Sequence, residues 1–316
     1  MSIRSSAYPS AKSQKRLIAI VGPTATGKSN LALSIAHEFG VEVVNADSRQ
    51  VYRYMDIGTD KPSLMSRTQV PHHLIDIVDP DENFNLAKYK NLATKTVGAI
   101  IESGKLPLLV GGSGLYVWSV LEGWNVPEVA PNYPLRHALE SRAANEGIQS
   151  LYKELQGIDP RAASRIDPAN VRRLVRALEI YEMTGHIPSQ LQRKTAPDLF
   201  TYIIGLNMER GELYRRIDER IDIMMQKGLI DETKKLFERG YNSRLSSMSG
   251  IGYKQIGEFL EGHIDLPSAI AKIKHDTRRL ARHQCAWFHL GDDRIHWIVG
   301  GNAEDEAKTM IRNFVL

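Results

Sequence analysis

Short apolar runs alternate with longer amphipathic stretches in the N-terminal third of the chain. Short, mostly apolar runs predict strands at residues 17–21, 41–44 and 106–110. Apolar residues at helical spacing follow the first run, and residues 86–103 and 113–121 also show a helical pattern. Strands that alternate with helices are typical of a parallel sheet, whose ligands bind at the carboxyl ends of the strands.

The pattern changes at residues 123–134, where one glycine and three prolines interrupt it. From there to residue 192 the sequence is helical without a convincing strand, and residues 200–206 form an apolar run again. We therefore expect an α/β core made of residues 17–126 and 197–316, with a helical insertion at 127–196. Further helices are expected at 210–227, 230–239, 254–261 and 266–288.

The charge of the chain changes this picture little. The net charge is +4 over 316 residues, and all of it comes from Arg4, Lys12, Lys15 and Arg16, because residues 1–16 contain no acid. This segment, rich in Ser and Ala, is predicted to be a disordered basic tail. The sequence has no membrane span or secretion signal, and a lone Cys285 excludes an internal disulfide and a Cys-rich zinc site. We therefore expect a cytoplasmic protein.

A phosphate-binding loop follows the first strand. Its residues are Gly22, Pro23, Thr24, Ala25, Thr26, Gly27, Lys28 and Ser29, which fit the pattern Gly-x-x-x-x-Gly-Lys-Ser between a strand and a helix. Glycines allow backbone N–H groups to surround an anion, while Lys28 can reach phosphate oxygens and Ser29 can reach Mg²⁺. The loop predicts a site for two linked phosphates.

The chain lacks a convincing carboxylate for nucleotide hydrolysis. A second strand that ends in an Asp normally holds the Mg²⁺, but the strand at 106–110 is followed by Gly111, Gly112 and Ser113. Asp76 interrupts the short apolar run of its own segment. The carboxylate that stands out is Asp47, which is delivered by the short apolar strand at residues 41–44. Its sequence position is equally compatible with a helix N-cap.

Two basic clusters are candidates for nucleic-acid contact. Residues 161–194 contain seven basic side chains, with Arg172 and Arg176 on one helix face. In the last predicted helix, Lys274, Arg278 and Arg282 recur every four residues, beside an apolar seam of Ile273, Leu280 and Trp287. We expect the seam to face the core and the basic stripe to be free for phosphates. Each cluster alone is more often a solvated face, but a polyanion needs several contacts.

Five segments together resemble the bacterial tRNA dimethylallyltransferases, over residues 17–290. They read GPTATGKS, NADSRQVYRYMDIGTDKP, LLVGGSGLY, NVRRLVRALEIYEMTG and GIGYKQ. The resemblance implies an α/β fold with a P-loop NTPase-like parallel sheet and an all-helical insertion domain. It also implies transfer of a dimethylallyl group from its diphosphate to the exocyclic amine of the adenosine 3′ of the anticodon, in tRNAs that read codons beginning with U.

The resemblance assigns roles to individual residues. Asp47 would accept the hydrogen of the amine, Lys28 would stabilise the leaving group, and Ser113 would touch the diphosphate or the base. Residues 22–29 and Arg220 would bind diphosphate, with Mg²⁺ at Ser29. The tRNA would be contacted by Asp47, Ser48, Arg49, Gln50, Arg172, Arg173, Arg176, Gly252, Tyr253, Lys254, Arg278 and Arg282. The insertion would hold the anticodon arm, and a monomer is the expected state.

Three other classes of protein remain open from the sequence. A small-molecule kinase shares the loop and the parallel sheet, but it would need the strand-end carboxylate. An adenylate isopentenyltransferase has the same donor chemistry with a free nucleotide as acceptor, and the insertion and the basic helix favour tRNA over it. A non-enzymatic RNA-binding protein leaves the phosphate loop unexplained.

Overall fold

The computed structural model describes residues 15–191, 193–300 and 302–315. All but the last two residues of the predicted tail lie outside this part of the chain. Arg16 is not a tail residue, because it is the first residue of strand β1 (Arg16–Val21) and its guanidinium donates to the carbonyl of Val315.

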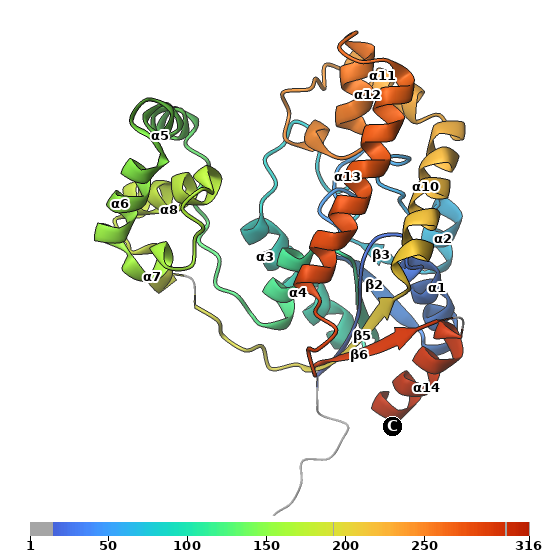
Figure 1. Cartoon of the computed structure of the whole chain (residues 1–316). Helices are drawn as coiled ribbons and strands as arrows, with labels where there is room; N and C mark the ends of the chain where they lie inside the picture. Colours follow the sequence, from blue (N-terminus) through green and yellow to red (C-terminus); the bar gives the residue numbers. More distant parts are fainter. Residues whose placement is uncertain (1–14, 192, 301, 316) are drawn as a thin grey trace, which may run out of the picture. The chain divides into compact units, whose positions relative to one another are not determined.

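The described chain has two compact units, and the first contains a six-stranded parallel sheet (Figure 1). The strand order is β3-β2-β4-β1-β5-β6, and every neighbouring pair is parallel. The other strands are β2 (Val41–Asn45), β3 (His72–His73), β4 (Leu106–Val110), β5 (Phe200–Asn207) and β6 (Ile295–Val299). The predicted parallel α/β class is confirmed, whereas β3 and β6 were not predicted.

Helices cover both faces of this sheet because its central strands are apolar on both sides. Helices α1 (Lys28–Phe39) and α14 (Ala303–Val315) share one core with side chains of β1, β2 and β4. Figure 1 shows α3 (Leu86–Glu102) on the opposite side of the sheet. The remaining helices of this unit are α2 (Leu64–Gln69), α10 (Arg210–Gln226), α11 (Leu229–Glu238), α12 (Tyr253–Leu260) and α13 (Leu266–Trp287).

The second unit comprises residues 85–88 and 118–197. It contains α5 (Tyr133–Glu146), α6 (Ile148–Ile158), α7 (Pro160–Ala163), α8 (Val171–Thr184) and α9 (Pro188–Leu191), and α4 (Gly114–Leu121) leads into it. Leu151, Leu155, Leu174 and Leu178 are completely buried in its own hydrophobic core. That core gives the helical unit a separate source of stability.

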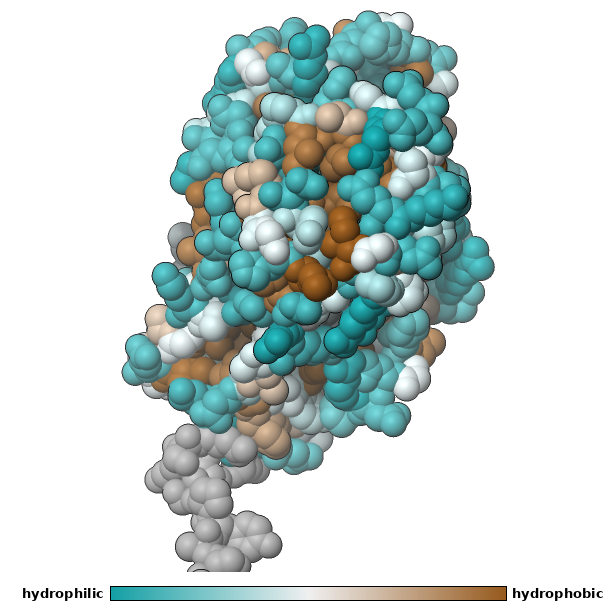
Figure 2. Space-filling view, turned by 90° about the vertical axis from the view of Figure 1, so that its left-hand side faces the viewer, coloured by the Kyte–Doolittle hydropathy of each residue, from teal (hydrophilic) through white to brown (hydrophobic). Residues whose placement is uncertain are grey.

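Hydrophilic residues predominate on the face of the molecule drawn in Figure 2, where apolar residues form separate patches. Within the described part of the chain, no helix has the length and apolar character that a membrane crossing requires.

Candidate functional site

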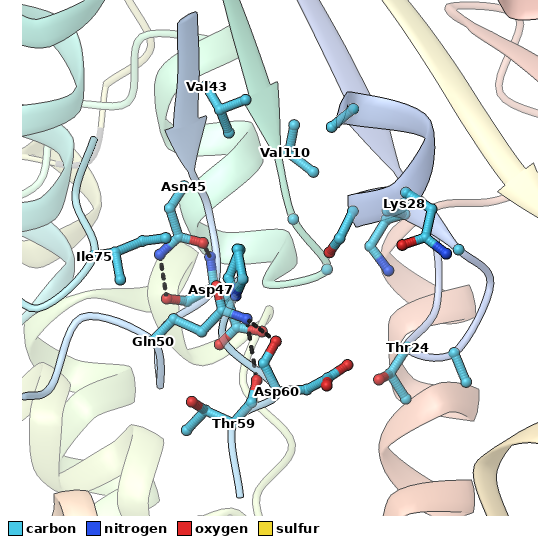
Figure 3. A pocket seen from close by; sticks show the side chains of 18 of the residues that line it. Thr24, Lys28, Val43, Asn45, Asp47, Gln50, Thr59, Asp60, Ile75 and Val110 are labelled. Atoms are coloured by element: carbon cyan, nitrogen blue, oxygen red, sulfur yellow. Dashed lines mark hydrogen bonds between the residues drawn. The ribbon is translucent and has the colours of Figure 1, made fainter. Parts of the chain in front are cut away.

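A cavity of about 300 Å³ lies at the carboxyl ends of β1, β2 and β4. Its position follows from the parallel sheet, whose strand ends and following loops meet at one edge. In Figure 3, Thr24 and Lys28 lie on one side of the cavity, and Asn45, Asp47 and Gln50 lie on the other. The phosphate loop and the predicted carboxylate therefore face the same space.

The phosphate loop depends on its two glycines. Gly22 has φ 135°, and a methyl group there would lie 2.3 Å from the carbonyl oxygen of Leu206. Gly27 has φ 92° and stands immediately before α1. The first N–H groups of a helix have no intrahelical acceptor, and the helix dipole is positive at this end. The loop therefore directs N–H groups and partial positive charge towards an anion.

Lys28 provides the main charge of the loop. Its ammonium donates to the carbonyl of Pro23 at 2.6 Å. Burial, and to a smaller extent the positive charge of Arg220, lower the pKa of Lys28 to about 8, while the negative charge of Asp47 opposes the shift. A bound diphosphate would add negative charge beside the ammonium and favour its protonated form.

Arg220 reaches the loop from α10. Its Nη1 donates to Thr24 Oγ1 at 2.7 Å, and its Nε lies 3.4 Å from a carboxylate oxygen of Asp60. Arg216, one turn earlier on the same helix, also lines the cavity and was not singled out in the sequence. The i,i+4 spacing of the two arginines was the available signal.

Asp47 combines a local structural role with a position in the cavity. Its Oδ1 accepts the N–H of Arg49 at 2.8 Å, so the carboxylate closes a turn. Asn45 fixes the same turn, because its Oδ1 accepts the N–H of Asp47 at 3.1 Å and its amide donates to the carbonyl of Asp47 at 3.2 Å. The second carboxylate oxygen is not used by this turn and is available to a ligand.

Ser113 supports the turn that carries Asp47. Its Oγ accepts the N–H of Ser48 at 3.0 Å, and the two hydroxyls lie 3.3 Å apart. Among the described residues, those that line the cavity include Asp47 and Gln50 but not Ser113. In this structure Ser113 therefore contacts Ser48 and is not one of the residues that line the cavity.

The side chains of Arg49 and Gln50 are engaged within the protein. Arg49 donates to the carbonyls of Ser246 and Ser247 at 2.9 and 3.3 Å. Gln50 donates to the carbonyls of Thr59 and Asp60 at 3.0 and 3.2 Å, as Figure 3 shows. Gln50 lines the cavity and holds two of its other lining residues, whereas Arg49 binds residues that do not line it.

Direct tRNA contact by Gly252 and Tyr253 does not fit this structure. Tyr253 is only 1% exposed, and Gly252 is also buried. The reason is packing, because the Tyr253 hydroxyl bonds to Glu232 and its ring lies against Gly58. Lys254 is exposed and remains a candidate for RNA contact.

The basic stripe of α13 is also not free, contrary to expectation. Lys274 pairs with Asp222 at 2.7 Å, and Arg278 donates to Asp218 at 3.1 Å. Arg282 donates to the hydroxyl of Tyr214 at 3.3 Å. All three partners lie on α10, and the predicted apolar seam is incomplete because Leu280 is 39% exposed. The basic residues of α13 therefore bind side chains of α10.

The arginines of α8 divide into two groups. Arg172 and Arg173 are exposed. Arg176 is half-buried, pairs with Glu179 at 2.5 Å and donates to the carbonyl of Val129 at 3.1 Å. Glu179 is completely buried and also accepts from Arg136. Arg176 therefore has a structural role that Arg172 and Arg173 do not share.

Gln284 is a cavity residue that the sequence did not reveal. It lies on α13, and its Oε1 accepts the N–H of Thr24 at 2.8 Å. The two residues are 260 positions apart. A single glutamine in an amphipathic helix gives no pattern from which this contact could be predicted.

Comparisons with known proteins agree with the geometry. A model of the IPP transferase family matches residues 50–291. A tRNA dimethylallyltransferase from Roseiflexus castenholzii is 52% identical over 273 residues, which are 86% of this chain and 89% of the relative. The crystal structure of the tRNA isopentenylpyrophosphate transferase from Bacillus halodurans is 42% identical, with a TM-score of 0.69 and 96% of each chain covered.

A third similar protein is a eukaryotic dimethylallyltransferase solved in crystallographic snapshots of its action on tRNA. It is 28% identical with a TM-score of 0.81, and the match covers 96% of this chain and 80% of that one. The family model spans more than half of this chain, and the relative from Roseiflexus castenholzii is 52% identical over 86% of it. The chain therefore belongs to the IPP transferase family, as the motifs in its sequence predicted.

Proposed function

We propose that this protein transfers a dimethylallyl group from dimethylallyl diphosphate to the exocyclic amine (N6) of a tRNA adenosine. The acceptor is the adenosine 3′ of the anticodon in tRNAs that read codons beginning with U. The observation that carries the proposal is that a phosphate-binding loop and the Asp47 carboxylate line one cavity. Such a site can hold a diphosphate leaving group opposite a proton acceptor.

The loop side of the cavity stabilises the leaving group. When the C–O bond of the donor breaks, its electron pair stays on the diphosphate, which gains negative charge. Lys28, Arg220 and the N–H groups at the start of α1 provide positive charge where that charge develops. Arg220 is already beside the loop through its bond to Thr24, so little reorganisation is required.

Magnesium fits the residues present at the loop. At a phosphate loop Mg²⁺ is held by the hydroxyl of the loop Ser or Thr, by phosphate oxygens and by water. Ser29 lines the cavity and would supply its hydroxyl. Among the described residues there is no cluster of three or more His, Cys, Asp or Glu side chains that could hold a metal. When bound, the ion would neutralise charge on the diphosphate.

The opposite side of the cavity handles the proton. The N6 atom forms a bond to the allylic carbon and loses one hydrogen, which the Asp47 carboxylate accepts. Asn45 and the N–H of Arg49 hold Asp47 in place, and Ser113 supports the turn through Ser48. Asp47 is a catalytic residue in this scheme, whereas Ser113 is a positioning residue.

The acceptor is a base in a stem-loop, which must leave its stack to reach a cavity. Arg172 and Arg173 are exposed on the helical unit and are suited to phosphate contacts on the anticodon arm. We propose that a monomer acts on tRNA in the cytoplasm.

One assay tests this function. The protein is mixed with labelled dimethylallyl diphosphate and with unmodified tRNA, AMP or no acceptor. We expect label in tRNA alone. Label in AMP would identify a free-nucleotide transferase. In a parallel mixture with ATP, release of phosphate without transfer of label would identify a kinase or ATPase. Binding of tRNA without transfer in any mixture would indicate a non-enzymatic RNA-binding protein.

A further inference from the structure

Gln284 fills the space between the phosphate loop and the end of β4. The side chain is 8% exposed. Its Oε1 accepts the N–H of Thr24 at 2.8 Å, and a methyl group added to Gly112 would lie 2.4 Å from its Nε2. The absence of a side chain at Gly112 thus leaves the room that the Gln284 amide occupies.

Three protein groups occupy the half of the loop next to β1. Gln284 takes the N–H of Thr24, Arg220 donates to Thr24 Oγ1, and Lys28 donates to the carbonyl of Pro23. The half of the loop next to α1 differs, because the first N–H groups of a helix have no acceptor within the helix. Phosphates bound at the helix therefore have donors, whereas a phosphate chain that extends towards Thr24 meets the Gln284 side chain.

In nucleoside triphosphatases the same kind of loop serves three phosphates, with backbone N–H groups around two and the lysine reaching towards the third. Here the side chain of Gln284 accepts from a loop N–H that would otherwise face the anion. A carbonyl oxygen at that place also repels phosphate oxygens, since both are acceptors. A third phosphate would have to displace Gln284 and leave its amide without the Thr24 bond.

We propose that Gln284 is a specificity-determining residue that limits the phosphate loop to two linked phosphates. The inference rests on the proposed function, because it concerns the diphosphate site of the same cavity. The contact with Thr24 gives a physical reason why a loop with a triphosphatase pattern serves a diphosphate donor.

A simpler role for Gln284 is to attach α13 to the loop. In that case its loss would loosen the loop and weaken all phosphate ligands by the same factor. A change in the preference between two and three phosphates separates the two roles, because a loosened loop has no reason to favour the longer chain.

The experiment measures the Kd of inorganic diphosphate and of tripolyphosphate, in the presence of Mg²⁺, for the full chain and for Gln284→Ala. We expect the wild-type protein to prefer diphosphate. The variant should shift the ratio of the two Kd values towards tripolyphosphate by roughly tenfold, the equivalent of about one hydrogen bond. An unchanged ratio would overturn the proposal.

Gln255→Ala is the matched control. Gln255 is also a buried glutamine with two bonds, to Gly252 and Asp276, but it does not line the cavity. Gln255→Ala should leave the ratio of the Kd values for diphosphate and tripolyphosphate unchanged. A shift equal to that of Gln284→Ala would also contradict the proposal.

Gln284→Glu covers the case in which Gln284→Ala fails to fold. The glutamate keeps an acceptor for Thr24 and adds a negative charge, so tripolyphosphate should be weakened more than diphosphate; an equal loss would count against the specificity role. A wild-type protein that binds diphosphate at the loop but transfers nothing to tRNA would instead refute the proposed function. These two failures are therefore distinguishable.

Discussion

The hydroxyl of Tyr253 donates to the carboxylate of Glu232 at 2.6 Å. The same carboxylate accepts the backbone N–H groups of Asp56, Ile57 and Gly58, at 3.0, 2.8 and 3.1 Å. Burial raises the pKa of Tyr253 well above its ordinary value, so the hydroxyl remains a donor at any working pH. The pair holds the loop that continues into Thr59 and Asp60, which line the cavity.

Removal of the Glu232 carboxylate should therefore affect both stability and catalysis. Glu232→Ala leaves three N–H groups without their charged acceptor, and hydrogen bonds to charged groups contribute about 1.5–3 kcal/mol each. Water can take the place of the carboxylate as acceptor for some of these N–H groups. We therefore expect the free energy of unfolding, measured with urea, to fall by about 2–4 kcal/mol. The KM for the donor should rise, because Asp60 positions Arg220.

Two further variants check the origin of that effect. Tyr253→Phe removes one bond of the carboxylate and should cost about 1 kcal/mol. Glu238→Ala changes an exposed residue of the same helix and should have no measurable effect on stability or KM. If Glu232→Ala were as stable as Glu238→Ala, the loop would not depend on the carboxylate.

Asp47→Asn tests the proton acceptor with little change in shape. The amide oxygen can still accept the N–H of Arg49, but it cannot accept a proton from the substrate amine. We expect kcat to fall by about two to four orders of magnitude, while the Kd for tRNA stays close to that of the wild type. Single-turnover transfer and filter binding on one preparation measure both quantities. A variant with normal kcat would exclude Asp47 from the chemistry.

Site residues that belong to a local sequence pattern could be predicted, whereas those that depend on contacts between distant parts of the chain could not. The loop at residues 22–29 and Asp47 could be predicted because the loop begins directly after an apolar strand and Asp47 stands two residues after another. Gln284 could not, since its partner Thr24 is 260 residues away. Tyr253 stood in a recognised motif, yet its burial depends on Gly58 and Glu232 from other parts of the chain.

The sheet shows the same limit. β6 lies at the edge of the sheet and has only two buried residues, Ile295 and Ile298, which are three positions apart, so it lacks the continuous buried run of β1. β3 has only two residues and depends on its pairing with β2. Neither strand produces a signal of its own that is strong enough to predict it.

Lys28 should couple donor binding to proton uptake. Its pKa in the free protein is about 8, and a bound diphosphate raises it. Between the two pKa values the complex holds more protons than the free protein, so affinity should be highest below pH 8 and should fall as pH rises above 8. The terminal phosphate of the donor loses its last proton at about pH 6. Titration of the donor therefore contributes little to the change in affinity above pH 8.

Calorimetry in buffers of different ionisation enthalpy measures this uptake. At pH 8.5 or so we expect a fraction of a proton taken up per donor bound by the wild type, and none by Lys28→Met. Lys105→Met is the control, because Lys105 is exposed, pairs with Glu42 and does not line the cavity. Equal uptake by all three proteins would assign the proton to another group.

The salt dependence of tRNA binding should distinguish the arginines of α8. Each phosphate contact releases counterions and contributes a little under one unit to the slope of log Kd against log salt. Arg172→Ala/Arg173→Ala should therefore reduce that slope by about one to two and raise the Kd for an anticodon stem-loop. The Kd for dimethylallyl diphosphate should not change, because neither residue lines the cavity.

Arg176→Ala provides the contrast within the same helix. Its guanidinium is bound to Glu179 and to the carbonyl of Val129, so its loss leaves a buried carboxylate with fewer partners. We expect a lower free energy of unfolding for the helical unit and a salt slope close to that of the wild type. A thermal melt and a salt titration on each variant give both quantities. Identical slopes in the wild type and the double variant would mean that Arg172 and Arg173 form only a solvated surface, and the phosphate contacts would then have to come from exposed residues such as Lys254.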